Sequence, residues 1–180
     1  MKQIFVREAL IFSLLLVLAL AGCKHGIHSA TGGRPSASSS AAGISSSADV
    51  VKVRSADVSI PAGGNADATV TLSISPGYHV NANPATFSYL IPTAVDPGKA
   101  EGVTAGKPNY PVAQKQKFQF AEEPLAVYEG EVQIRLPLHV EVKAGKGERS
   151  LLVDVRVQAC DSEKCYAPDT LKTMIVVDVK

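Results

Sequence analysis

The sequence predicts an all-β fold, an antiparallel β-sandwich that begins near Asp49 and ends at Lys180. Three observations lead to this prediction. Apolar and polar residues alternate over several short segments, which is the pattern of strands with one buried face. Turns rich in Gly and Pro, such as "PAGGN", "SPGY" and "DPGK", separate these segments. No stretch of this part of the chain has the period of an amphipathic helix.

The expected strands follow one another along the chain. Residues 49–60 supply one or two strands, and residues 67–75, "DATVTLSIS", supply the next. Residues 131–142, "EVQIRLPLHVEV", are the clearest case, because every even position from Val132 to Val142 is apolar. Pro137 falls on the outward phase and indicates an edge strand or a bulge. The segment "KAGKGERS" then predicts a hairpin turn to a strand at 151–159, and "TMIVVDV" supplies the last strand.

The N-terminus predicts export and a lipid anchor. Lys2 and Arg7 precede an apolar run that ends in "LAGC" at Cys23. The run is too short for a good membrane span and is typical of a secretory signal peptide, here residues 1–22. Its end resembles the bacterial lipobox, which implies that Cys23 is lipidated; the alternative is an ordinary signal peptide with a chance cysteine. Because Lys24 and not Asp follows, we expect the periplasmic face of the outer membrane rather than the inner membrane.

A linker separates this anchor from a single domain. Residues 23–48 are rich in Ser, Gly and Ala, with almost nothing to bury, and are expected to be a disordered tether. Residues 49–180 have the length of one domain. The formal net charge is +1, with acidic and basic residues interspersed, so nucleic acid is not an expected partner.

The other two cysteines lie in "VQACDSEKCYAPDT". In an extracytoplasmic compartment Cys160 and Cys165 can form a disulfide, which would close a loop of about six residues. Such a loop stabilises a fold by about 2 kcal/mol, against about 4.7 kcal/mol for a loop of 100 residues. The strand phase puts Cys160 in the outward series with Arg156 and Gln158, so its thiol is expected near solvent. The spacing alone matches neither a common zinc pattern nor the thioredoxin Cys-x-x-Cys motif.

Several stretches together resemble a known family. "GYHVNANPA", "NYP", "VYEGEVQIRLPL" and "ACDSEKCYAPDT" occur in the order found in the N-terminal periplasmic domain of DsbD-type thiol:disulfide interchange proteins. The resemblance covers most of residues 50–180 and implies an immunoglobulin-like sandwich whose cysteine pair, here Cys160 and Cys165, shuttles electrons. The implied partners are thioredoxin-like periplasmic oxidoreductases and, because no membrane carrier domain is present in this sequence, a separate membrane electron carrier. No cofactor is implied, and the cysteine spacing is one residue shorter than in the best-known members.

Members of this family shield the disulfide with an aromatic cap loop, which implies further site residues. Phe118 or Phe120 in "KFQFAEEP" is the cap candidate, with Phe118 favoured, and Tyr166 is another; burial of both phenylalanines in the core is the alternative. His79 matches a common family position and is interpreted as structural, at a strand end. Of the two cysteines, Cys165 is the expected partner-facing sulfur.

Three functions remain open at this point. The leading hypothesis is a lipid-anchored, extracytoplasmic thiol:disulfide exchange module. The second is a non-enzymatic immunoglobulin-like interaction domain with a static disulfide. The third is a copper or zinc site that combines the thiols with His79 or His139. No Ser/His/Asp arrangement, phosphate loop or carboxylate pair can be placed.

Overall fold

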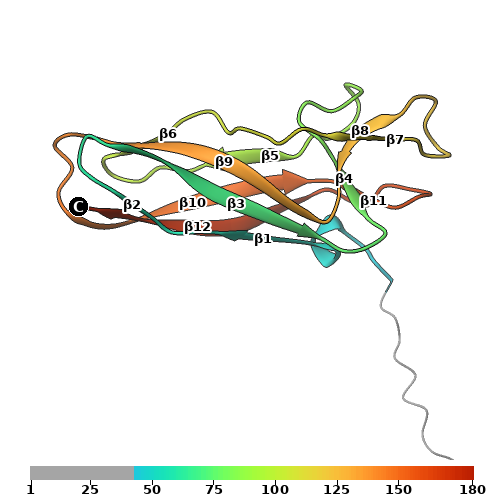
Figure 1. Ribbon diagram of the computed structural model, residues 1–180. Coiled ribbons are helices and arrows are strands. Elements are labelled where there is room, and N and C mark those ends of the chain that lie inside the picture. The colour runs from blue at the N-terminus through green and yellow to red at the C-terminus, as the bar shows by residue number, and fades with distance from the viewer. Residues whose placement is uncertain (1–42) are drawn as a thin grey trace, which may run out of the picture. The chain divides into compact units, whose positions relative to one another are not determined.

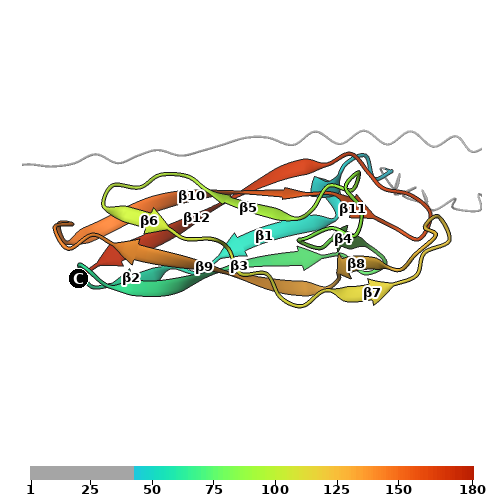
Figure 2. The ribbon, with the colours of Figure 1, turned by 90° about the horizontal axis from the view of Figure 1, so that it is seen from above.

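The computed structural model describes residues 43–180, which form a β-sandwich of the immunoglobulin type (Figure 1). Two four-stranded sheets build the sandwich, and a third, smaller sheet lies at one end (Figures 1 and 2). In spatial order, the first sheet contains β1 (Val51–Ser55), β3 (Asn65–Ile74), β9 (Glu131–Val140) and β6 (Val103–Ala105). The second contains β2 (Val58–Ile60), β12 (Asp169–Val179), β10 (Gly147–Val157) and β5 (Ala94–Pro97). The small end sheet contains β11 (Ala159–Cys160), β4 (His79–Asn81), β8 (Leu125–Tyr128) and β7 (Gln114–Gln116).

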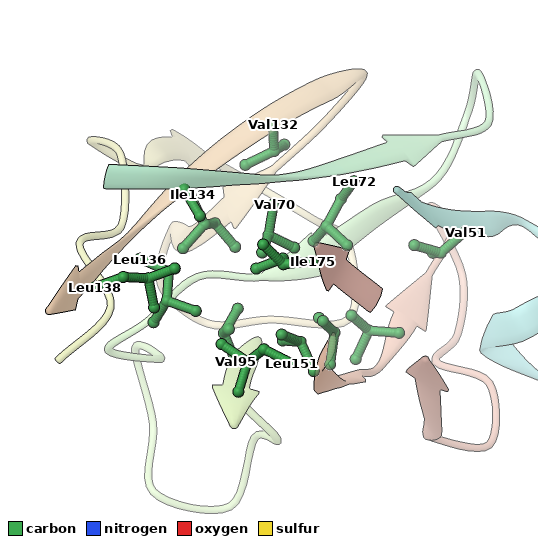
Figure 3. Packing of buried hydrophobic residues seen from close by; sticks show 14 of the residues in the cluster. Val51, Val70, Leu72, Val95, Val132, Ile134, Leu136, Leu138, Leu151 and Ile175 are labelled. Atoms are coloured by element: carbon green, nitrogen blue, oxygen red, sulfur yellow. The ribbon is translucent and has the colours of Figure 1, made fainter. Parts of the chain in front are cut away.

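The predicted strand phases are confirmed in the long strands. In β9, Val132, Ile134, Leu136, Leu138 and Val140 are buried and the residues between them are largely exposed. The strand β3 lies antiparallel to β9, with Val70 opposite Ile134. Side chains from both large sheets meet in the core between them (Figure 3). The apolar face of each strand therefore has a partner sheet to cover it, which is what makes a sandwich of alternating strands stable.

Several local expectations differ from the structure. The segment 143–150 is not a hairpin turn, because its second half already belongs to β10, and β9 and β10, joined by residues 141–146, lie in different sheets. Val142 was expected on the buried face but lies beyond the end of β9 and is 79% exposed. Nearly all pairings are antiparallel, but β2 lies parallel to β12.

Pro137 lies neither on an edge strand nor at a bulge, because β9 has neighbours on both sides and its register with β3 is continuous. The carbonyl of Pro137 accepts a hydrogen bond from Gly106 N, 2.7 Å away, just beyond the end of β6. In a strand, N and O of one residue point to the same side. The missing N–H of the proline therefore faces the side where β6 has ended, and no bond to β3 is lost.

The chain joins the sandwich at the short 3-10 helix η1 (Ser47–Asp49). Ser47 and Ala48 lie in the expected linker, but Ser47 is fully buried and bonded to the domain. Among residues 43–180, no helix is long and apolar enough to cross a membrane.

Candidate functional site

Cys160 and Cys165 form a disulfide, with their Cα atoms 3.9 Å apart. The bond lies at the end of the domain that carries the small sheet (Figure 1). The two sulfurs have unequal surroundings, because Cys160 is 0% exposed whereas Cys165 lies in an exposed loop. The long strands before and after this pair, β10 and β12, are direct neighbours.

The expectation that Cys160 lies near solvent is wrong. Its phase was predicted correctly, since Ala159 joins the main core and Cys160 points to the other face of the strand. The chain, however, leaves β10 after Val157 and continues as β11, which pairs with β4. There Cys160 lies opposite His79, which is itself buried beneath the stacked ring of Phe118.

A single carboxylate organises the loop between the cysteines. Asp161 accepts hydrogen bonds from the backbone N–H groups of Glu163 and Lys164, both at 2.8 Å, and from the Tyr166 hydroxyl at 2.5 Å. These bonds lower the pKa of Asp161 to about 2, and the bond from Tyr166 has the largest effect. The same contact raises the pKa of the Tyr166 hydroxyl, because ionisation would place a second anion beside the carboxylate. The role of Asp161 in the structure is therefore to shape the loop.

A buried serine closes the base of this loop. The Ser47 hydroxyl donates to Ala167 O at 2.7 Å and accepts from Ala159 N at 2.8 Å. A backbone bond lies beside these contacts, in which Tyr166 N donates to Ala159 O at 2.8 Å. The residues on either side of the disulfide are therefore held together by η1, a segment 112 residues earlier in the chain. Sequence reasoning missed Ser47, since a serine in a Ser-rich stretch carries no signal of burial.

The three aromatic candidates differ in their surroundings. Phe118 is 6% exposed, packs in a small cluster with Leu125 and Val127, and stacks on the His79 ring with 4.1 Å between centroids. Phe120 is 43% exposed and stacks on Phe118, with 5.3 Å between the ring centroids. Tyr166 is half-buried, with its ring 5.9 Å from that of Tyr78 and its hydroxyl bonded to Asp161. Phe118 is thus a core residue of the small cluster and covers His79, the side chain opposite Cys160, whereas its role as a cap over the disulfide stays a prediction.

His79 begins β4, in agreement with its expected place at a strand end. It is 1% exposed, and its Nε2 atom is buried without a hydrogen-bond partner among the described residues. Burial lowers the pKa of His79 to about 4, with the Asp161 charge opposing the shift. A cavity of about 640 Å³ runs past this histidine, lined among others by Tyr78, Phe118 and Ser162.

The metal hypothesis finds no support in this part of the chain. Both thiols are joined in the disulfide, and His139 lies on β9, where its Nδ1 is 2.9 Å from Asn65 Oδ1. No group of three or more His, Cys, Asp or Glu side chains that could hold a metal ion exists within residues 43–180.

The fold and the site define an immunoglobulin-like β-sandwich with a disulfide between one buried and one exposed cysteine at its end. The chain belongs to the family of the N-terminal domain of the thiol:disulfide interchange protein DsbD, which matches residues 47–176. The family is one of thiol:disulfide exchange, and the chain carries the disulfide that this chemistry requires.

Solved structures of similar domains include members of this family and others. The reduced N-terminal domain of DsbD from Neisseria meningitidis is 18% identical, with a TM-score of 0.41 over 65% of this chain and 82% of that one. The N-terminal periplasmic domain of ScsB from Proteus mirabilis is 12% identical, with a TM-score of 0.44 over 68% of this chain and 44% of that one. A type I cohesin from Pseudobacteroides cellulosolvens is 8% identical, with a TM-score of 0.46 over 73% of this chain and 92% of that one. No curated protein matches the sequence.

Proposed function

We propose that this protein is a membrane-anchored, extracytoplasmic thiol:disulfide exchange module that passes electrons through Cys160 and Cys165. The observation that carries the proposal is the unequal burial of the two sulfurs in a chain of this family. Only Cys165 can be approached by a bulky partner, while Cys160 is held back within the domain. Short, exposed disulfides are those that exchange readily, whereas structural ones are protected.

The chemistry follows from this asymmetry. A thiolate of a reduced, thioredoxin-like donor attacks Sγ of Cys165, a new bond forms between the two sulfurs, and the Cys160–Cys165 bond breaks. The electron pair of the broken bond passes to Sγ of Cys160. If the reaction reverses, the Cys160 thiolate attacks Sγ of Cys165 and restores the original disulfide. If a second donor thiol instead resolves the mixed disulfide, the domain leaves as a dithiol and can reduce the disulfide of an acceptor in the same manner.

The domain needs separate proteins at both ends of this exchange. Cys160 and Cys165 are the only cysteines after Cys23, so no second redox pair exists in the sequence to supply electrons. The proposed donor is a thioredoxin-like domain fed by a separate membrane electron carrier, and the proposed acceptors are periplasmic thioredoxin-like oxidoreductases.

Trapping of the mixed disulfide tests the exchange. Cys160→Ala leaves an exposed Cys165 without its resolving sulfur and should accumulate a mixed disulfide with a thioredoxin-like protein in a periplasmic extract. Cys165→Ala is the matched control, which retains a buried thiol and should trap far less. Absence of any trapped partner, together with a reduction potential below about −300 mV, would favour a static disulfide in an interaction domain.

The anchor forms a separate part of the proposal. Cys23 lies outside the described residues, and its lipidation at the outer membrane, facing the periplasm, is inferred from the sequence motif alone. Cys23→Ser should release the domain into the soluble fraction, because residue 23 then carries no acyl chains to hold the protein at the membrane. If the variant is still processed and still sediments with outer-membrane vesicles, the anchor is not at Cys23.

A further inference from the structure

The small sheet places a histidine beside the buried sulfur. In the pairing of β11 with β4, Ala159 lies opposite Val80 and Cys160 lies opposite His79. Val80 and Ala159 both belong to the main core. Side chains alternate between faces along a strand, so His79 and Cys160 share the other face. Directly opposed residues of an antiparallel pair have Cβ atoms roughly 4.5–5.5 Å apart, which is within reach of an imidazole ring.

The histidine has a polar atom that lacks a partner. Nε2 of His79 is buried and accepts or donates no hydrogen bond within the described domain. Phe118 stacks on the ring and holds it in place, with 20° between the two planes. Buried polar groups in folded proteins nearly always have a partner, so an unpaired one calls for an explanation. A disulfide sulfur is a weak acceptor, whereas a thiolate is a strong one.

Reduction of the disulfide creates the acceptor that is missing. When a donor thiolate attacks Cys165, the electron pair of the broken bond goes to Sγ of Cys160, which is 0% exposed. A thiolate buried without a partner is unfavourable, because burial removes its hydration. A neutral imidazole on the same face can donate its N–H to this sulfur, and the sulfur takes up a proton from solvent or from the donor thiol when the step is complete.

We propose that His79 is the hydrogen-bond donor to the sulfur of Cys160 in the reduced and mixed-disulfide states. This inference rests on the proposed exchange at Cys165, which makes Cys160 the leaving sulfur. The charge of Asp161 in the loop acts on the ring, and the exposed Glu129 lines the same cavity. The lowered pKa of His79 keeps the ring neutral at pH 7, so it acts as a donor and does not carry a positive charge.

Two substitutions separate this role from simple packing. Both are made in the full chain with Cys23→Ala, and the disulfide is equilibrated with glutathione. His79→Phe keeps an aromatic ring against Phe118 but removes the N–H, and should lower the equilibrium constant for reduction about tenfold, which is about 30 mV. His79→Gln loses the aromatic stack but keeps an N–H donor, and should stay closer to the original chain. A packing role alone predicts the opposite order, and that order would overturn the inference.

The thiol itself provides a second readout. In a background that carries both Cys23→Ala and Cys165→Ala, the ultraviolet absorbance of the thiolate gives the pKa of Cys160, because Cys160 is then the only thiol. His79→Phe should raise this pKa by about one unit, since the thiolate loses its donor. An unchanged pKa would count against the hydrogen bond.

A third measurement needs no substitution at His79. The ¹⁵N shift of its Nε2 should change when the disulfide of the Cys23→Ala chain is reduced, whereas His139, paired with Asn65 on β9, serves as the unchanged control. Equal behaviour of the two histidines would overturn the proposal even if the variants fail to fold. None of these assays uses a partner protein, so they can succeed when partner trapping fails. The hydrogen bond from His79 and the proposed exchange with a partner are therefore tested separately.

Discussion

Truncation of Phe118 tests whether one side chain both packs the small cluster and covers the redox site. Phe118→Ala removes a ring that is 6% exposed and contacts Leu125 and Val127. Replacement of a buried Phe by Ala costs about 3–5 kcal/mol of unfolding free energy. The ring also borders an open cavity of about 640 Å³, so water can occupy part of the space. We therefore expect the lower end, about 3 kcal/mol.

Phe120→Ala is the matched control, because it removes the same ring from a neighbouring position that is 43% exposed. Full burial of a Phe contributes about 1.5–3 kcal/mol, so partial burial predicts a loss of about 1–1.5 kcal/mol. Urea titration gives the free energy of unfolding, and reduction of the disulfide by dithiothreitol in native buffer gives its accessibility. Phe118→Ala should also speed reduction more than Phe120→Ala. Equal stability losses and equal reduction rates would refute the assignment of both roles to Phe118.

Three further predictions concern the loop and its base. Ser47→Ala leaves Ala159 N–H without its acceptor and should cost about 1–3 kcal/mol in thermal or urea unfolding, whereas the exposed Ser45→Ala should change little; equal effects would contradict the clamp. Asp161→Asn weakens the hydrogen bonds that fold the loop and should speed reduction by a small thiol, an effect that an unchanged rate would exclude. Burial lowers the pKa of His79 in the folded state to about 4, from an ordinary 6.5. The free energy of unfolding should therefore be unaffected by this group above pH 6.5 and should fall by about 3 kcal/mol as the pH decreases from 6.5 towards 4. His79→Phe should abolish this loss. The Asp161 contribution is lost in a separate window, as the pH falls from 3.8 to 2, because its pKa is lowered on folding.

The alternation of apolar residues was sufficient to predict the long strands. Val153, Val155 and Val157 are buried in β10 as their phase required, because a period of two is fixed by the backbone itself. The alternation does not determine which strands pair with one another. Residues 141–146 have the Gly and Lys of a turn, yet they join strands of different sheets, since a tight turn and a crossing between sheets use the same residue types.

The site was predictable in its chemistry but not in its surroundings. The spacing and context of Cys160 and Cys165 pointed to the disulfide, which local sequence determines. The burial of Cys160 depends on β4, about 80 residues away in the sequence, and on Phe118. The buried Ser47 depends on contacts with Ala159 and Ala167, which are 112 and 120 residues away. A single sequence shows periodicity along the chain and carries no direct signal for such long-range pairs.

The course of β12 has a practical consequence for experiments with this domain. The strand begins at Asp169, four residues after Cys165, and ends at Val179 beside the C-terminus. Eleven residues at about 3.4 Å each place the chain end roughly 34 Å from the start of the strand, at the opposite end of the sandwich from β11 (Figure 1). A fluorophore, an affinity tag or a sensor surface attached after Lys180 will therefore leave the sulfurs open to large reagents. The same label placed just before Ser45 would lie beside η1 and the residues that flank the loop, where it would compete with any protein that docks on Cys165.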